Sequence, residues 1–270
     1  MASSGSGYDL SSSTFSPDGR IFQVQYAQKA VENAGTALGI KCSDGVVLAV
    51  EKPKVNKMLL DNFSRRIHTV DTHSGVAITG FISDGRQVVN RAREEASNYD
   101  ESYGSSIPPK VLADRVGSYV HYFTLHGALR PFGSAVLIAS YDPETKEHML
   151  SMVEPSGAAY QYYGCAAGKG RQPAKTEMEK LNLHKAETVL TVQEGVKQLA
   201  RIIYSLHDES KDKPFELEMS WISKDTKWEH RGVPKDVIAA AVEWAKEDIE
   251  AAQDDDDDEE EEEGGVMEES

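Results

Sequence analysis

Residues 16–27 read Ser-Pro-Asp-Gly-Arg-Ile-Phe-Gln-Val-Gln-Tyr-Ala, and a Tyr8-Asp9 pair stands shortly before them. The apolar residues of this stretch alternate with Gln23 and Gln25, as they do in a half-buried strand. Apolar residues also recur at helical spacing from Val24 onward. Periodicity alone therefore leaves both a strand and a helix open.

Residues suited to a helix start favour the helix. Ser16 or Asp18 can accept a hydrogen bond from an unpaired amide, and the fixed φ of Pro17 suits a first helical turn. We therefore expect a helix that begins near residue 19 and runs over about 19–33.

Composition and charge predict one large domain followed by a tail. The chain has 270 residues and 39% hydrophobic content, which suffices for a sizeable core. The net charge of −16 is concentrated at the end, where 12 of the 45 acidic residues fall within 253–270. The remaining 33 acidic and 29 basic groups give the body a charge of only about −4. We expect a domain over 1–252 and a disordered acidic tail over 253–270.

The same composition argues for a cytoplasmic or nuclear protein. No apolar run approaches the roughly 20 residues that span a bilayer, and the first residues lack the pattern of a signal peptide. Cys42 and Cys165 are too few for a disulfide framework or a zinc site and fit a reducing compartment.

Working outward from residues 16–27, the patterns predict hairpins and amphipathic helices. The expected strands are 35–41, 45–51, 66–70, 75–81, 133–139, 148–153, 158–162 and 215–222. The expected helices begin near residues 84, 110, 172, 191 and 234. The first four strands are expected to form most of one sheet. This order is not the strict alternation of a parallel doubly wound sheet, so we predict an α+β fold: two mainly antiparallel sheets between helical layers, an α-β-β-α sandwich.

The pair Tyr8-Asp9, the run Phe-Ser-Pro-Asp-Gly-Arg at 15–20 and the run Phe-Gln-Val-Gln-Tyr-Ala at 22–27 resemble the amino-terminal signature of α-type subunits of the 20S proteasome. The chain departs from that signature at Leu10 and Gln25, where many members have Arg and Glu. The resemblance implies the four-layer fold of amino-terminal-nucleophile hydrolases over residues 8 to about 250. It also implies a non-catalytic subunit of a threonine-protease complex, without a cofactor. The expected partners are neighbouring α subunits in a seven-membered ring, the β ring, and a regulatory particle or other activators. The expected role is control of substrate entry in ubiquitin- and ATP-dependent protein degradation.

The resemblance also implies two groups of site residues. Tyr8, Asp9, Pro17 and Tyr26 match the cluster that holds the gate open around the ring axis in the family, and residues 1–7 match its gate-forming tail. Arg66 stands near the place where most members carry a Lys in the pocket that receives activator tails. A cation there pairs with a terminal carboxylate, so we expect Arg66 and Gly80 to line such a pocket.

An active hydrolase is the alternative. Thr36 follows Gly35 at the start of a predicted strand, and a threonine freed at its amine can act as its own base and nucleophile. The signature upstream argues against removal of residues 8–33, and an internal Thr has only a peptide nitrogen beside it. Glu51, near the position of an active-site Asp in the catalytic relatives, is more simply a strand-end charge.

The spacing of the remaining candidate residues does not fit a phosphate-binding or a metal-binding motif. The glycine-rich run 164–170 is too short for a phosphate-binding loop, and we interpret it as a strand-to-helix turn. His121 and His126 are five apart and match no metal-binding face, so no metal is expected. The pair Glu94-Glu95 indicates a solvated helix face. The acidic tail leaves two alternatives open, a solvated segment or a docking element for a basic partner; a free-standing regulator acting through this tail is a weaker third hypothesis.

Overall fold

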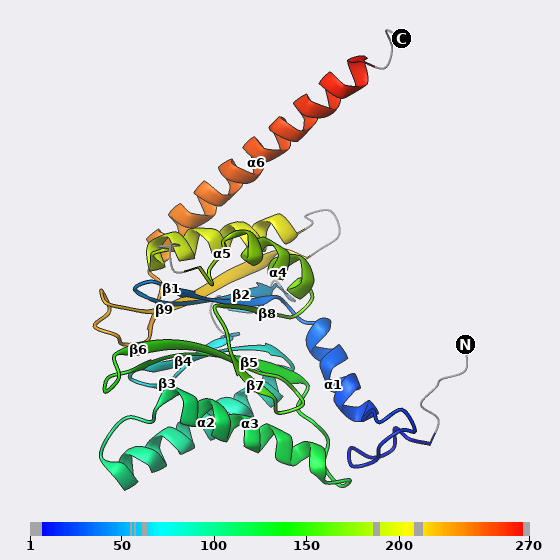
Figure 1. Ribbon diagram of the computed structural model, residues 1–270, viewed down its shortest axis with the longest axis vertical. Helices are drawn as coiled ribbons and strands as arrows, with labels where there is room; N and C mark the ends of the chain where they lie inside the picture. Colours follow the sequence, from blue (N-terminus) through cyan, green and yellow to red (C-terminus); the bar gives the residue numbers. More distant parts are fainter. Residues whose placement is uncertain are drawn as a thin grey trace.

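Two antiparallel sheets of five strands each form the centre of the molecule (Figure 1). The computed structural model describes residues 7–54, 56, 58–60, 64–185, 190–207 and 213–266, with side chains up to residue 252. The first sheet has the strand order β10 (Arg231–Gly232), β9 (Phe215–Ser223), β2 (Gly45–Pro53), β1 (Ala37–Cys42) and β8 (Gly164–Ala167). The second has the order β3 (Ile67–Asp71), β4 (Ser74–Gly80), β5 (Ser134–Asp142), β6 (Glu147–Val153) and β7 (Ala159–Gln161).

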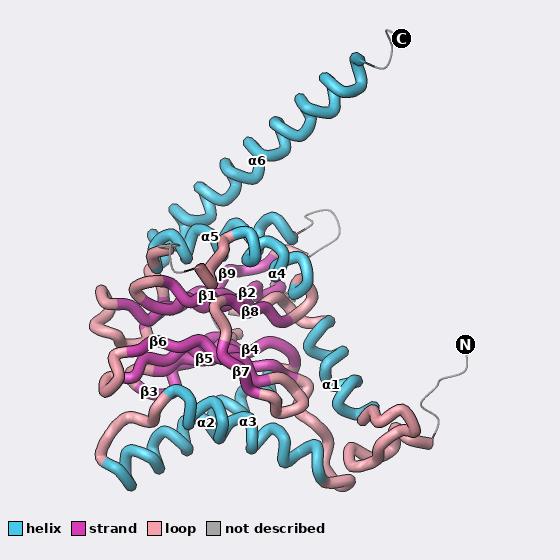
Figure 2. The backbone as a smooth tube through the Cα atoms, in the orientation of Figure 1, coloured by secondary structure: helices cyan, strands magenta, loops and turns pink. Residues whose placement is uncertain are grey.

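Helices cover the outer face of each sheet, as Figures 1 and 2 show. The second sheet packs against α2 (Ile82–Tyr103) and α3 (Pro109–Leu125). The first sheet packs against α4 (Arg171–Lys180) and α5 (Val192–Leu206), and α6 (Lys235–Val266) packs on α5. Helix α1 (Phe22–Glu32) lies at the side of the sandwich, against β4 and β5. The predicted α-β-β-α sandwich is therefore confirmed.

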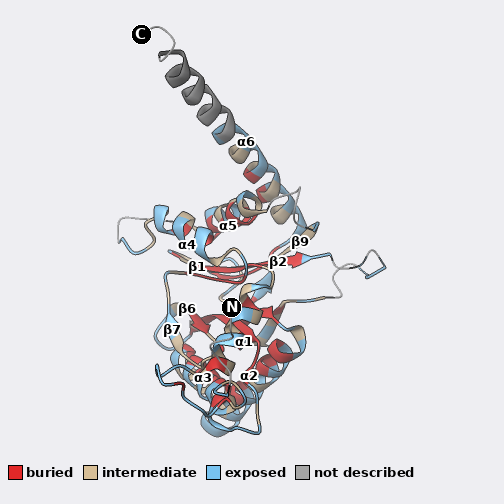
Figure 3. Cartoon of the chain, turned by 90° about the vertical axis from the view of Figure 1, so that its right-hand side faces the viewer, coloured by how far each residue is buried: buried red, intermediate tan, exposed pale blue. Residues whose placement is uncertain are grey.

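Apolar side chains of three clusters fill the spaces between the four layers. Figure 3 shows buried positions in the sheets and in the helices that cover them. Leu199 and Ile203 of α5 meet the first sheet, Leu48 and Leu137 meet between the sheets, and Leu112 of α3 lies under the second sheet. Burying each such side chain stabilises the fold by roughly 1.5–3 kcal/mol. Because both faces of a central strand are covered, β4 is buried at all seven positions rather than alternating.

The structure corrects three expectations about the strands. The first two hairpins do not share a sheet: β1–β2 belongs to the first sheet and β3–β4 to the second. The predicted turn at 164–170 begins with β8, which pairs with β1 through its small residues. The two-residue strand β10 was not predicted either. Strands this short, with glycines and small side chains, carry no alternating pattern that a sequence argument could detect.

Two expectations about the chain ends remain predictions. Residues 1–6 and 267–270, and the side chains of 253–266, lie outside those described, so the mobile gate tail and the disordered acidic tail are not tested. In the described part of the chain, none of the helices combines the length and the apolar character that crossing a bilayer requires.

Candidate functional site

The stretch before α1 forms a tight turn instead of a helix start. The Gly19 amide donates to the Ser16 carbonyl at 2.9 Å, and the Ser16 side chain accepts from the Arg20 amide at 3.1 Å. Gly19 has φ +73°, a conformation that glycine adopts without steric cost. Helix α1 begins only at Phe22, and its N-cap residue, Ile21, provides no side-chain cap. The expected start near residue 19 is therefore wrong, because Ser16 closes a turn on itself and does not cap the helix.

Helix α1 holds the segment that precedes this turn. The Tyr26 hydroxyl donates to the Asp9 carboxylate at 3.2 Å, and the Gln23 side-chain amide donates to the Asp9 backbone carbonyl. Tyr8 and Pro17 lie exposed on the surface. Of the four predicted gate residues, the structure thus joins Asp9 and Tyr26 directly and leaves the other two accessible.

Helix α1 is fixed to the sandwich at its C-terminal end. Val31 is buried between the sheets, and Glu32 pairs with Arg171 of α4 and, at 3.2 Å, with Lys29. The hydrogen bond from Arg171 lowers the pKa of Glu32 below its ordinary value, so this carboxylate is charged at neutral pH. The helix is therefore attached to the sandwich at one end and holds the N-terminal segment at the other.

Beside α1 lies a cavity of about 650 Å³ that contains both predicted pocket residues. It is lined by α1, the end of β2, the residues before β3 and the end of β4, including Tyr26, Lys52, Arg66, Gly80 and Phe81. One Arg66 guanidinium nitrogen donates to the Gly80 carbonyl at 2.9 Å. The structure thus places Arg66 and Gly80 side by side on one wall.

Gly80 is the residue type that this wall requires. Its φ is +104°, and a Cβ atom there would lie 2.2 Å from the carbonyl oxygen of Gly133, the residue just before the neighbouring strand β5. A side chain at this position would push the Gly80 backbone away from Gly133, and with it the Gly80 carbonyl that accepts from Arg66.

Two of the cations that line the cavity are not exposed, Lys52 and Arg66. Their side chains have different partners. Lys52 is 5% exposed and lies 3.2 Å from Glu216 and 3.5 Å from Glu218, which come from the neighbouring strand β9. The Glu218 carboxylate also accepts a hydrogen bond from the Arg66 backbone amide at 2.9 Å. The Arg66 guanidinium instead donates to a neutral carbonyl. Burial lowers its pKa from the ordinary value without removing its charge, and the nearby Glu218 charge opposes this shift. Of these two cations, Arg66 is therefore the one with donors that an anionic ligand can use.

Sequence reasoning missed Lys52 and its two carboxylate partners. Lys52 faces Glu216 directly across the β2–β9 pair, and Glu218 is the diagonal neighbour. Only the strand register, which no sequence pattern specifies over this separation, brings these charges together.

Thr36 has no free amine and its hydroxyl is already engaged. The Thr36 amide donates to Glu51 at 3.0 Å, and the Thr36 hydroxyl accepts from the Gly170 amide at 3.1 Å. Thr36 is 3% exposed, and the Gly35 carbonyl before it accepts from the Thr79 hydroxyl at 2.5 Å. In this arrangement the Thr36 nitrogen is a peptide amide, which cannot act as the base for its own hydroxyl.

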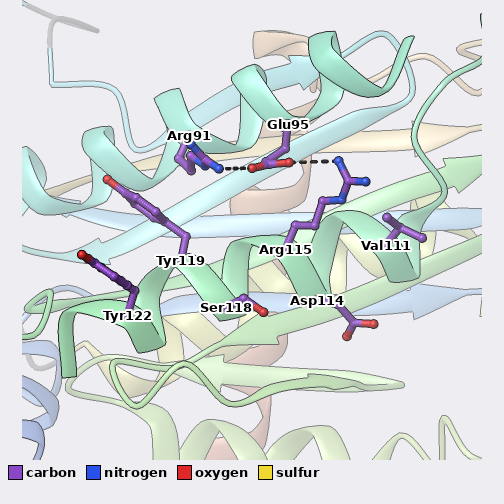
Figure 4. A pocket seen from close by; sticks show the side chains of 8 residues that line it. All are labelled: Arg91, Glu95, Val111, Asp114, Arg115, Ser118, Tyr119 and Tyr122. Atoms are coloured by element: carbon purple, nitrogen blue, oxygen red, sulfur yellow. Dashed lines mark hydrogen bonds and ion pairs between the residues drawn. The ribbon is translucent and has the colours of Figure 1, made fainter. Parts of the chain in front are cut away.

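A second cavity, of about 590 Å³, lies between α2 and α3 (Figure 4). The Glu95 carboxylate lies between Arg91 and Arg115, with 3.0 Å to Arg115, and Tyr119 lies under the Arg91 guanidinium at 5.2 Å. The expected solvated face is thus wrong for Glu95, which is 8% exposed, although Glu94 is exposed. Packing of α3 against α2 buries one of the two carboxylates and not the other. In the part of the chain that is described, no group of three or more metal-ligating side chains could hold an ion.

Comparisons with known proteins match most of the chain. The family model described as "Proteasome subunit" matches residues 31–222, and the model for the N-terminal signature of A-type proteasome subunits matches residues 8–30. The chain is 54% identical over 254 residues to "Proteasome subunit alpha type-3" of Spinacia oleracea, covering 93% of this chain and 100% of that protein. It is 48% identical over 255 residues to "Probable proteasome subunit alpha type-7" of Saccharomyces cerevisiae, covering 94% and 88%. A 44% identity over 241 residues relates it to "Proteasome subunit alpha type-3" of Drosophila melanogaster, covering 89% and 93%.

Proposed function

Because the chain belongs to the proteasome subunit family, as an α-type and non-catalytic subunit of the 20S core particle that is most like alpha type-3, we propose that it restricts the axial entrance of that particle and binds the tails of activators. Membership implies assembly with other proteasome subunits. The arrangement in a seven-membered ring against a β ring, and the location in cytoplasm and nucleus, are part of the proposal. The Thr36 hydrolase alternative is contradicted, since the matched α-type signature identifies a non-catalytic subunit.

The observation that carries the proposal is the Arg66 guanidinium in the cavity beside α1. It is held by the Gly80 carbonyl, next to Lys52, whose charge Glu216 and Glu218 already compensate. A carboxylate that enters the cavity meets a partly buried cation with donors left to offer, and charge-assisted hydrogen bonds of this kind are the strong ones. The exposed Phe81 on the same wall adds apolar contact for the residues next to such a carboxylate.

The gating half of the proposal is supported by the segment before α1. Asp9 is fixed to Gln23 and Tyr26, while Tyr8 and Pro17 stay accessible, so the segment has a defined position and still offers side chains to a neighbour. A gate requires both properties, since a segment without attachment would not occupy a defined place at an entrance.

The test is charge reversal at Arg66 in reconstituted 20S particles that contain this chain. We expect Arg66→Glu to weaken binding of an activator tail peptide at this subunit by about 10- to 100-fold, the equivalent of one charge-assisted hydrogen bond. The readout is the yield of cross-linking between this chain and a tail peptide with a photoreactive residue, together with stimulated peptide hydrolysis.

Arg65→Glu is the matched control, because it makes the same charge change one residue away. The Arg65 side chain is exposed and does not line the cavity. Equal cross-linking in wild type, Arg65→Glu and Arg66→Glu particles would contradict the docking proposal. Loss in Arg66→Glu alone would support it.

A further inference from the structure

Ser12 inverts the usual pattern of burial in the segment before α1. Leu10 and Phe15 are 86% and 65% exposed, whereas Ser12, a polar residue between them, is 1% exposed. A segment that exposes its apolar residues and buries a hydroxyl is held by hydrogen bonds and not by apolar contact.

The hydrogen bonds of Ser12 reach a distant part of the chain. Its hydroxyl donates to two backbone carbonyl oxygens of the loop between α3 and β5, which share its single proton: His126 at 2.8 Å and Leu129 at 3.1 Å. Ser11 and Ser13, on either side, hydrogen-bond each other at 2.9 Å in a contact that is open to solvent. Figure 1 shows the segment passing beside the end of α3.

Gly127 allows this close approach. A Cβ atom on Gly127 would lie 2.7 Å from the Ser11 hydroxyl oxygen and 3.3 Å from that of Ser13. The glycine thus lets the segment lie directly on the loop backbone, where the carbonyls of His126 and Leu129 are within reach of Ser12.

The loop that accepts these bonds is itself fixed to α2. Arg130 donates two hydrogen bonds to Asp84, at 2.6 and 2.9 Å, and the Gly133 amide donates to the same carboxylate at 2.9 Å. The Arg130 hydrogen bonds lower the pKa of Asp84, so this carboxylate keeps its charge at neutral pH. The anchor for Ser12 therefore has a defined position relative to the sandwich.

We propose that Ser12 is a positioning residue that holds the N-terminal segment to the α3–β5 loop, an attachment we name the Ser12 latch. It adds a second attachment to the one that Gln23 and Tyr26 of α1 make at Asp9. Residues 7–11, which precede the latch, extend from a fixed point, so the latch determines how far they reach toward a neighbouring subunit. The consequence for substrate entry rests on the gating role proposed above.

The test compares Ser12→Ala with Ser13→Ala in reconstituted particles that contain the full chain. Ser13→Ala also removes one hydroxyl, but from an exposed residue whose side chain bonds only Ser11 among the described contacts. We expect amide hydrogen exchange over residues 8–15 to become about 5- to 10-fold faster in Ser12→Ala, the effect of losing one buried hydrogen bond, and to stay unchanged in Ser13→Ala. Gly127→Ala, which disturbs the latch from the other side, should accelerate exchange in the same residues.

Basal hydrolysis of a short fluorogenic peptide is the second readout, and deletion of residues 1–10 is its reference. If the latch positions the gate, Ser12→Ala raises basal hydrolysis several-fold toward the level of the deletion. Exchange in Ser12→Ala equal to that in Ser13→Ala would overturn the latch. If Ser12→Ala accelerates exchange and even the deletion leaves hydrolysis unchanged, the latch stands and the gating proposal fails.

Discussion

Strand β4 runs between two ends of the sandwich that differ in how far their aromatic side chains are exposed and how closely they stack. At its C-terminal end, around Gly80, Tyr26 and Phe81 line the cavity and are 47% and 58% exposed. At its N-terminal end, beyond Ser74, Trp228 stacks on Tyr141 with ring centroids 4.2 Å apart and an interplanar angle of 7°. The first end leaves about half of each ring exposed, although Tyr26 also stacks on Phe22 with ring centroids 6.2 Å apart. The second end pairs its rings closely within the chain.

The paired end also contains strained backbone. Lys227 and Trp228 have φ values of +57° and +62°, a conformation that costs a non-glycine residue about 1–2 kcal/mol. Hydrogen bonds across the two sheets offset this cost, from the His230 amide to the Thr72 carbonyl and between His73 and the Trp228 carbonyl, both at 2.8 Å. One end therefore uses its aromatic residues for stability, whereas the other leaves them exposed beside the cavity proposed to bind activator tails.

The largest effect is expected from Trp228→Ala, which removes the stack. We expect the free energy of unfolding to fall by about 3 kcal/mol, the low end for loss of a large aromatic side chain, because Trp228 is only half-buried. The measurement is urea unfolding of the purified chain.

Lys227→Ala is the matched control for the backbone, since Lys227 has the same left-handed conformation and an exposed side chain. Its effect should stay within about 0.5 kcal/mol. Equal effects of the two substitutions would assign the stability to the loop backbone and break the comparison.

The next effect in size concerns pH. Burial lowers the pKa of His230 from its ordinary value of 6.5 to about 4, and the ring donates or accepts one hydrogen bond, with Thr69 at 2.8 Å. Between pH 6.5 and 4 the unfolded chain binds a proton at this histidine that the folded chain does not. Stability therefore falls as the pH falls through this window, by about 3 kcal/mol in total, and does not depend on His230 above it.

Unfolding free energies measured from pH 7 to 4 in wild type and in His230→Asn test this expectation. Asparagine can replace the hydrogen bond to Thr69 without titrating, so the variant should show a shallower decline. Burial lowers the pKa of His148 in the same direction, which leaves part of the decline in both proteins. Identical slopes would show that His230 does not control the acid stability of this end.

The layered fold could be predicted from sequence because each layer has a local pattern. Alternating and continuous apolar runs indicated strands, and the stripe through Val88, Ala92 and Ala96 indicated the helix now seen as α2. Sheet membership could not be predicted, since a hairpin with both faces buried looks the same in either sheet. The edge strands β8 and β10 were missed because four and two residues carry no period.

In the candidate site, too, some residues could be predicted from the sequence and others could not. The resemblance of residues 8–27 led to Asp9, Tyr26, Arg66 and Gly80, and the structure places them as two adjoining pairs. Ser12 and Lys52 gave no sequence signal. Their partners lie more than a hundred residues away along the chain, so only the fold brings them together.

The smallest effect is expected at the exposed end, from Tyr26→Phe. The substitution removes only the hydroxyl that donates to Asp9, and Gln23 continues to hold the Asp9 carbonyl. Because this contact is open to solvent, the urea midpoint should not change, while amide exchange at residues 9 and 10 should rise by about twofold through local opening. Tyr8→Phe, which removes the same atom from another exposed tyrosine, should change neither. A fall in the midpoint of Tyr26→Phe would mean that the exposed end also stabilises the fold, and the division between an end that stabilises the fold and an exposed end would fail.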